Sequence, residues 1–306
     1  MKITSLRLFL FIVLVSLFGS TQSFGQYYYY NDKYFDTDWL FEIGGSTGAM
    51  FALTDVGRIY KKKKIILLSH RRFDQKLVKP NYTFYAGMMY QNTVGIRLEY
   101  TTGNIEGNDM HNTVESPRHI TGLNFRSAIR EVAAIGEFHP IMLKYYDDMP
   151  RFSPYIMAGI GVFSFKPEGN YRGQWIDLKP LNTEGQGFRE YPDRQEYSLT
   201  AVSFPVGLGI KWEATAFFNL RAEVIGRFTT TDYIDDASQD YIEADLFYKY
   251  FNTQKAALAT AMAERYHTQD PIHDYTNYIR GGKVSNDGYI TFNLKLGIVL
   301  GREKIR

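Results

Sequence analysis

The 306-residue sequence contains no cysteine. This absence excludes a disulfide framework, a cysteine nucleophile and a thiolate metal site, and we expect no lipoprotein anchor. Net charge is also nearly absent, because 35 basic residues stand against 33 acidic ones, and this balance offers no electrostatic reason to expect a nucleic-acid partner. After the N-terminal region no segment has about 20 consecutive apolar residues, which excludes a bundle of membrane-spanning helices.

The N-terminus has the pattern of a secretory signal peptide. Lys2 and Arg7 precede an apolar run at residues 8–18, and small and polar residues follow it. We expect residues 1–25 to be removed by cleavage after Gly25. A retained membrane anchor is the alternative, but the apolar run is too short to span a bilayer comfortably as a helix.

Aromatic residues are abundant: 24 Tyr, 22 Phe and 3 Trp make up 16% of the chain. Such side chains are favoured in β-strands and at membrane–water interfaces. The mean hydropathy of −0.30 suits a soluble protein. It suits an outer-membrane barrel equally well, because the strands of a barrel place only every second residue in lipid. The choice between these classes therefore depends on periodicity.

Residues 289–300 show the clearest strand pattern. Six apolar residues alternate there with a second face, over a length that exceeds the usual five or six residues of a globular strand and that crosses a membrane at a tilt. The alternation recurs at 39–44, 93–100, 202–212 and 218–228, and weaker strand patterns occupy 81–90, 125–139 and 153–165. The pattern predicts eight strands.

The connections between these strands alternate in length. Short turns are expected near 91–92, 147–148 and 214–215, and long connections at 50–80, 103–123, 166–196 and 230–287. Outer-membrane barrels have this organisation, with short periplasmic turns and long external loops, whereas a soluble sandwich has no reason to adopt it.

The sequence thus predicts an all-β fold: an eight-stranded antiparallel transmembrane β-barrel with long external loops and a short helix in the last loop. The barrel is expected to occupy residues 39–301 of a protein of the Gram-negative outer membrane. Residues 26–38 and 302–306 are the expected periplasmic N-terminal segment and C-terminal tail, because an even strand number places both termini on the same side.

Ten charged residues fall on the predicted inward face, five acidic and five basic. The interior of an eight-stranded barrel is just wide enough to be filled by side chains, and charges there must be paired to be tolerated. We therefore expect a lumen plugged by ion pairs and not a conducting pore. These residues are Glu42, Arg97, Glu99, Glu131, Glu137, Lys211, Arg221, Glu223, Arg227 and Lys295. Arg126 and Arg130 fall on the outward face, which predicts either a place at the outer rim or a β-bulge.

Two long loops have distinctive compositions. The first contains four consecutive lysines at 61–64, followed by Arg71 and Arg72, which could bind lipopolysaccharide or a partner, although a solvated charge run is the favoured interpretation. The last contains an alanine-rich helix at about 253–267, with Thr253 as its expected N-cap. This helix is expected to form a lid over the barrel mouth or a docking surface.

The loop histidines and aspartates do not suggest an active site. Catalytic and metal sites need groups that converge, and no tight metal-ligand spacing or phosphate-binding glycine loop is present. We expect no enzymatic activity, no cofactor and no small-molecule substrate. A calcium site at the loop aspartates is a weaker alternative. The residues considered are His111, His119, His267, His273, Asp232, Asp235 and Asp236.

Two loop segments, 175–187 and 231–238, together with 125–127 and 154–161, resemble the PorG-like family of outer-membrane barrels. The resemblance extends over about 39–301 and is most specific at 175–187. The loop residues that carry it are Trp175, Asp177, Pro180, Glu184, Gly185, Gly187, Asp232, Tyr233, Asp235 and Asp236.

This resemblance implies a component of the type IX secretion and gliding machinery, with outer-membrane lipid, a periplasmic ring lipoprotein and the partner of that lipoprotein as contacts. The leading hypothesis is therefore a non-enzymatic barrel that anchors or organises the assembly, using its periplasmic turns and the tyrosines at 27–30. The tetra-lysine loop and the long last loop depart from the family and leave open whether this is the main component or a paralogue. A surface-binding or adhesin-like barrel and a barrel hydrolase that uses His267 or Asp235 are the alternatives.

Overall fold

The computed structural model describes residues 28–31, 33–57, 77–111, 122–144, 150–264, 280–282 and 285–305. The predicted signal peptide, the tetra-lysine run and three of the loop histidines (His119, His267 and His273) lie outside these residues. Among the described residues, no helix is both long and apolar enough to cross a bilayer.

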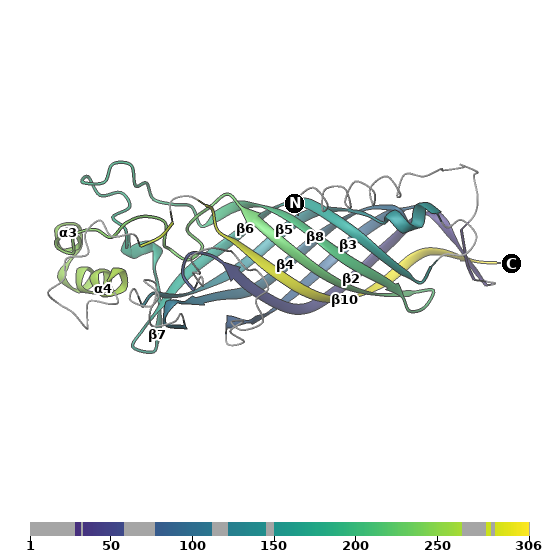
Figure 1. Cartoon of the computed structure of the whole chain (residues 1–306), viewed down its shortest axis with the longest axis horizontal. Coiled ribbons are helices and arrows are strands. Elements are labelled where there is room, and N and C mark those ends of the chain that lie inside the picture. The colour runs from purple at the N-terminus through teal and green to yellow at the C-terminus, as the bar shows by residue number, and fades with distance from the viewer. Residues whose placement is uncertain are drawn as a thin grey trace, which may run out of the picture.

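Eight antiparallel strands form a closed ring, as the sequence pattern predicts (Figure 1). They are β2 (Tyr34–Leu53), β3 (Lys79–Tyr90), β4 (Val94–Asn108), β5 (Asn124–Phe138), β6 (Phe152–Tyr171), β8 (Thr200–Glu213), β9 (Phe218–Thr229) and β10 (Gly288–Lys304). β2 pairs with both β3 and β10 and thereby closes the barrel. Two short strands that the sequence did not predict, β1 (Tyr28–Asn31) and β7 (Gln174–Asp177), pair with β2 and β6. The first and last barrel strands extend beyond the expected limits of 39 and 301.

The alternation in the sequence becomes two faces of opposite polarity. On β10, Leu294 is 69% exposed, whereas the adjacent Asn293 and Lys295 are 2% exposed or less. The same division holds around the ring, so that apolar side chains cover the outside and polar ones fill the inside. An exposed apolar belt of this extent is stable only in contact with lipid, and a closed barrel leaves no unpaired strand edge inside the bilayer. The fold is therefore a transmembrane β-barrel.

Aromatic side chains mark both margins of the belt. At one margin Trp39 lies against Tyr90, with ring centroids 4.9 Å apart, and Phe152 stacks on Trp212 at 5.8 Å. Exposed aromatic residues also occupy the other margin; they include Tyr82, Phe84, Tyr100, Phe204 and Phe228. Amphipathic rings prefer the headgroup level, so these girdles indicate where the two bilayer surfaces lie.

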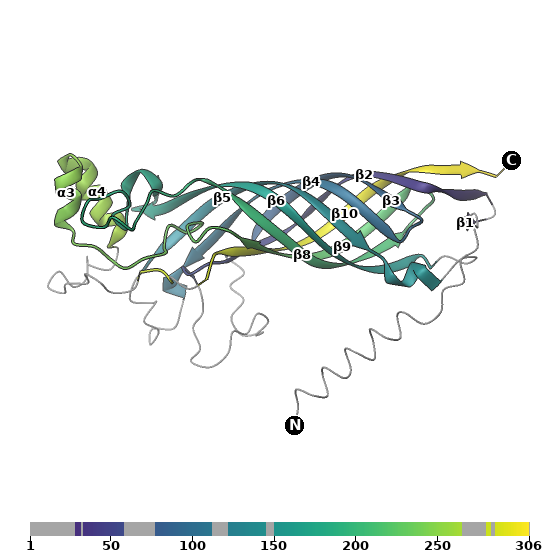
Figure 2. The same ribbon diagram turned by 90° about the horizontal axis from the view of Figure 1, so that it is seen from above.

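Short and long connections emerge at opposite ends of the barrel (Figures 1 and 2). The β3–β4 hairpin turns at Gln91 and Asn92, whose positive φ angles of 46° and 53° match the twist of the flanking strands. The β5–β6 connection contains a 3-10 turn, η3 (Pro140–Lys144), and the β8–β9 connection turns at residues 214–217. β1 and the end of β10 lie at this same turn end. The described parts of the long connections lie at the other end, called here the loop end.

Two outward arginines on β5 lie beyond the belt, toward the loop end. The register of β5 with β4 and β6 is continuous, so no bulge accounts for them. Arg126 forms a 2.5 Å ion pair with Glu168 and lies over the Trp175 ring at 4.4 Å. Arg130 pairs across the sheet with the polar residues Thr102 and Ser164. Both arginines therefore occupy the rim of the belt.

A small cap stands at the loop end, built from two helices and a 3-10 turn (Figure 2). These are α3 (Asp245–Tyr250), α4 (Thr253–Ala263) and η4 (Lys179–Leu181). The expected N-cap at Thr253 is wrong: the cap of α4 is Asn252, whose side chain accepts a 2.9 Å bond from the Lys255 amide, because its carboxamide reaches the N3 position. α4 ends at Ala263, short of the expected boundary at about 267, which lies outside the described residues, and α3 had no counterpart in the prediction.

Candidate functional site

A network of buried ion pairs fills the half of the lumen nearest the turn end. Its centre is Arg97 on β4, which forms ion pairs with three carboxylates: Glu99 at 2.7 Å, Glu223 at 3.1 Å, and Glu137. Arg221 on β9 bridges Glu137 at 2.9 Å and Glu42 at 2.7 Å. The guanidinium group presents several donors in a fixed fork, which suits it to link carboxylates from different strands. The two arginines thus join β2, β4, β5 and β9 across the lumen.

Lysines and one further arginine complete the set. Lys295 pairs with Glu99 and, at 3.0 Å, with Glu223. Lys211 contacts Glu213 at 3.0 Å. Toward the loop end, Arg227 and Glu131 are 2.5 Å apart. All ten inward charges named from the sequence lie inside the barrel, and each has an ion-pair partner among the described residues; the list comprises Glu42, Arg97, Glu99, Glu131, Glu137, Lys211, Arg221, Glu223, Arg227 and Lys295.

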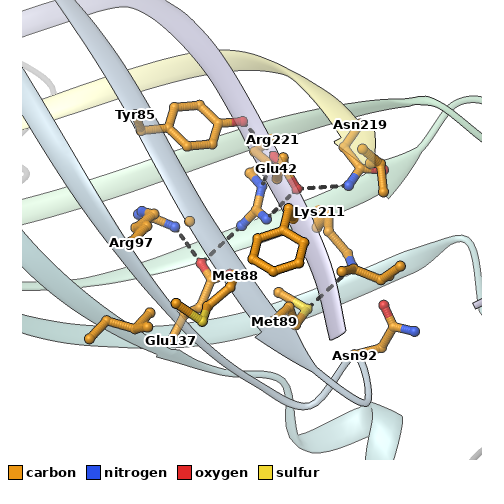
Figure 3. Close-up of a pocket in the computed structure, with 15 residues that line it drawn as sticks. Glu42, Tyr85, Met88, Met89, Asn92, Arg97, Glu137, Lys211, Asn219 and Arg221 are labelled. Carbon is orange, nitrogen blue, oxygen red and sulfur yellow. Dashed lines mark hydrogen bonds and ion pairs between the residues drawn. The ribbon is translucent and has the colours of Figure 1, made fainter. Parts of the chain in front are cut away.

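Figure 3 shows residues that line the space left within this network. The cavity lined by Glu42, Tyr85, Arg97, Asn219 and Arg221 has a volume of about 20 Å³, which is room for roughly one water molecule. Tyr85 donates a 2.5 Å hydrogen bond to Glu42, and Asn219 donates to the other oxygen of the same carboxylate at 2.9 Å. The cavity is therefore an interstice of the polar core and offers no continuous path for a solute.

An apolar cluster closes the other half of the lumen. Ile129 on β5 and Phe163 on β6 point inward, and Ile234 and Ala237 from the last long connection pack against them, all at most 1% exposed. Inserting loop side chains here removes water from the mouth of the barrel. The lumen is thus closed twice, by ion pairs toward the turn end and by apolar packing toward the loop end.

A further ion triad at the turn end ties the ends of β2 and β10 to β8. Arg302, near the end of β10, lies 2.6 Å from both Asp36 on β2 and Glu213 on β8. Asn92 in the β3–β4 turn donates to the same Asp36 at 2.7 Å. Sequence analysis missed this triad, because Arg302 and Asp36 were assigned to segments outside the barrel. The triad secures the point where β2 and β10 leave the belt.

Ser153, His139 and Glu137 lie in a row that superficially resembles a catalytic triad. His139 Nδ1 is 2.8 Å from Ser153 Oγ, and its Nε2 is 3.7 Å from Glu137 Oε1. The exposed fractions of these side chains are 0% for Ser153 and His139 and 6% for Glu137, so the hydroxyl is not accessible to a substrate. Glu137 is moreover shared by Arg97 and Arg221. The arrangement belongs to the packed lumen.

The two loop segments that carry the family resemblance meet at the loop end. Glu184 accepts 3.0 Å hydrogen bonds from the Ser238 and Gln239 amides and pairs with Arg280 at 3.0 Å. Asp236 accepts a bond from Thr183. Burial raises the pKa of Glu184, and the Arg280 charge acts in the opposite direction. This polar knot, defined as Thr183, Glu184, Asp236 and Arg280, holds the two segments together beneath the cap.

The remaining motif residues have separate roles. Trp175 and Asp177 on β7 lie at the outer surface, where Asp177 pairs with Lys166 at 2.7 Å. Pro180 belongs to η4, which packs on α4. Gly185 and Gly187 adopt φ angles of 73° and 79°, a conformation that favours glycine. Tyr233 stacks on Tyr197 with ring centroids 4.4 Å apart.

Among the loop aspartates, Asp232 lies close enough to Asp235 for its charge to raise the pKa of Asp235, whereas Asp236 is directed elsewhere. Asp235 accepts hydrogen bonds from the amides of Val56 at 2.8 Å and Ala237 at 3.0 Å, whereas Asp236 is directed at Thr183 and Arg280. Burial raises the pKa of Asp232 to about 7 and that of Asp235 well above its usual value. Within the described residues, no group of three or more His, Asp or Glu side chains is arranged to hold a metal ion.

The chain matches the model of one protein family, described as a domain of unknown function (DUF6089), over residues 77–267. No curated protein sequence matches it.

Similar solved structures are Neisserial surface protein A (10% identity, 86% of this chain and 97% of that chain, TM-score 0.37), and the attachment invasion locus protein Ail of Yersinia pestis, solved with a heparin analogue (10% identity, 86% and 97%, TM-score 0.34). The N-terminal β-barrel domain of Pseudomonas aeruginosa OprF is also similar (10% identity, 87% and 99%, TM-score 0.34). The barrel itself is established by the strand pairing of this chain.

Proposed function

This chain belongs to the DUF6089 family, and we propose that it is a non-enzymatic outer-membrane barrel that anchors or organises a type IX secretion assembly through periplasmic ring proteins. The observation that supports this most is the doubly closed lumen. A barrel with an interior occupied by ion pairs and apolar packing does not serve as a passage, so its function lies at its two ends.

The turn end carries a structure suited to a protein partner. Beyond the shift between Leu300 and Arg302, β10 continues to pair with β2, and β1 pairs with β2 on the opposite side. The result is a three-stranded ribbon, made of residues 28–31, 34–36 and 302–304, that extends past the belt (Figure 2). β1 is the terminal strand of the sheet order, and no other described strand pairs with its second edge. An open edge of this kind accepts a partner strand through backbone hydrogen bonds.

The polarity of the connections favours a periplasmic position for this ribbon. Short turns at one end and long loops at the other are the organisation of outer-membrane barrels with the turns in the periplasm. In that orientation the ribbon, which contains the tyrosines at 28–30, faces the periplasmic ring lipoprotein and its partner.

Crosslinking in intact outer membranes, followed by purification of the barrel, tests the proposal. Wild-type protein is expected to recover both ring components, and a variant lacking residues 27–31 is expected to lose them while still forming a heat-modifiable barrel. A Tyr248→Ala variant, altered at an exposed cap residue, is the matched control and should recover them normally. Undiminished recovery without residues 27–31, or normal cargo export after gene deletion, would overturn the proposal.

The cap supports a second candidate, a surface-binding barrel. α3, α4 and η4 enclose their own apolar core above the barrel, in which Phe247, Ala259 and Met262 are completely buried. A preorganised element of this kind loses little entropy on binding. Replacing residues 244–264 by a flexible linker would then abolish binding of a surface ligand and leave export unchanged, whereas the first proposal predicts the reverse for loss of β1.

The hydrolase alternative has less support. Its candidate Asp235 is engaged by two backbone amides, so the carboxylate already has a structural role. Loss of a hydrolytic activity in Asp235→Ala protein that still inserts normally would favour it and contradict the non-enzymatic proposal.

A further inference from the structure

A row of polar side chains crosses the outer surface of the barrel near the loop end. Cross-strand pairing places Tyr82, Thr102, Arg130, Ser164 and Thr200 side by side on β3, β4, β5, β6 and β8. All five lie on the outward face, and four of them are exposed. The row therefore presents one guanidinium group flanked on each side by hydroxyl groups.

The adjacent row toward the middle of the barrel is apolar or aromatic. It consists of Phe84, Tyr100, Val132, Val162 and Val202, paired across the same strands. The polar row is thus the first step beyond the belt, at the level where acyl chains give way to headgroups. A charged side chain at this depth meets lipid phosphates and carries little of the penalty that it would carry at the middle of the bilayer.

Arg130 differs from its charged neighbours because it has no ion-pair partner among the described residues. Arg126 is paired with Glu168, and the ammonium of Lys166 lies 2.7 Å from Asp177 and 3.3 Å from Glu168. Lys166 is nevertheless half exposed, and it lies on the next row, where its cross-strand partner is the small residue Ala128. Arg130 and Lys166 are therefore diagonal neighbours on β5 and β6, flanked only by the small side chains of Ser164 and Ala128.

We propose that this surface binds the phosphate of a lipid headgroup in the leaflet at the loop end. Arg130 supplies a bidentate cation, Lys166 a second positive charge, and Thr102 and Ser164 hydroxyl donors. Guanidinium matches phosphate geometry through two parallel hydrogen bonds, and the position on the lipid-facing surface restricts the occupant to a membrane lipid. This site is independent of the partner bound at the turn end.

Native mass spectrometry of the barrel in neutral-lipid nanodiscs that contain diphosphoryl lipid A tests the site. Wild-type protein is expected to retain diphosphoryl lipid A in preference to the same glycolipid without phosphates. Arg130→Gln should reduce retention about fivefold and Arg130→Gln with Lys166→Gln further, because each cation near a membrane surface contributes about one such factor. The Arg130→Lys variant should retain an intermediate amount of diphosphoryl lipid A, since an ammonium group keeps the charge but cannot form the two parallel hydrogen bonds of a guanidinium group.

The matched control is Arg151→Gln, which removes an exposed arginine at the turn end of the barrel. Heat-modifiability of every variant on gels shows that the barrel is formed. Equal retention by wild type, Arg130→Gln and Arg151→Gln would overturn the proposal, as would equal retention of the phosphorylated and phosphate-free lipids.

Discussion

In the barrel, the side chains buried in the lumen include arginine, lysine and glutamate, and the side chains exposed on the outer face include leucine, valine and phenylalanine. In the cap the relation is reversed: Phe247 and Met262 are fully buried, and the exposed surface includes Lys249, paired with Glu190. Apolar side chains face lipid in the first region and each other in the second, because the surroundings are hydrocarbon in one case and water in the other. In both regions the apolar side chains avoid water: they face outward into lipid in the barrel and inward into a core in the cap.

The comparison also explains the unremarkable composition. A mean hydropathy of −0.30 averages a barrel with apolar residues at every second position and long polar connections. Burial of charge is tolerated in the lumen because each charged group is surrounded by partners, whereas the cap contains an ordinary apolar core.

Arg97→Ala is expected to have the largest effect, since it leaves three carboxylates in the lumen without their shared cation. The free energy of unfolding should fall by about 3–5 kcal/mol. Urea unfolding of the barrel in lipid vesicles measures this change, with Lys249→Ala, at an exposed ion pair of the cap, as a control that changes little. A loss below about 1 kcal/mol would mean that the lumen network is not what holds the barrel interior together.

Leu208→Lys tests the lipid-facing side of the comparison. Leu208 is 64% exposed at the middle of the belt, between Ile156 and Val224. A lysine there should destabilise the inserted barrel by about 2–4 kcal/mol, whereas Thr200→Lys, at the belt margin, should cost about 0–1 kcal/mol. The same vesicle assay measures both variants, and equal effects would contradict the assigned position of the belt.

Met262→Ala tests whether the cap is held by its own core. Removing this fully buried side chain should destabilise the cap by about 2–3 kcal/mol. The cap should become susceptible to protease while the heat-modifiability of the barrel is unchanged, and Tyr248→Ala, at a half-exposed residue, should leave protease resistance intact. Simultaneous loss of barrel stability would show that cap and barrel form one cooperative unit.

The smallest expected effect is a pH dependence at the boundary between the two regions. The pKa of Asp232 is raised to about 7, so the folded state binds its proton more tightly than the unfolded chain does. This contribution to stability is complete below the unfolded pKa near 4 and is lost as the pH rises through about 7. Protease cleavage of the last loop should therefore accelerate about two- to threefold from pH 5 to pH 8, an effect reduced by solvent screening. The Asp232→Asn variant should be cleaved at the same rate at both pH values. If its ratio of cleavage rates at pH 8 and pH 5 equals that of the wild type, Asp232 is not the group responsible.

The eight strands and the direction of the lumen charges were predictable because a strand alternates its faces with a period of two. Glu42 and Lys295 were assigned inward from this period alone, and Arg130 outward. Reasoning from residue preferences placed the α4 cap one residue late, since Asn252 and Thr253 are both acceptable N-caps and local sequence does not choose between them. It also missed α3, a helix of only six residues whose Phe247 packs against α4 and against the Phe188 ring.

The sequence pattern could not predict which charged side chains pair with one another. Arg280 and Glu184 are 96 positions apart, and Arg97 and Glu223 are 126 apart, so neither contact leaves a signature in a window of neighbouring residues. The meeting of segments 183–187 and 236–239 beneath the cap depends in the same way on how two long connections fold back over the barrel mouth.

The sequence by itself therefore determined the strand number, the lipid-facing and lumen-facing sides and the balance of interior charge, because backbone geometry and transfer free energy act on adjacent residues. Only the tertiary structure decided which cation meets which carboxylate, how the lumen is closed at both ends and that Arg130 stands without an ion-pair partner among described residues at the belt margin. Those outcomes depend on strand register and barrel closure, which bring together side chains that are remote along the chain.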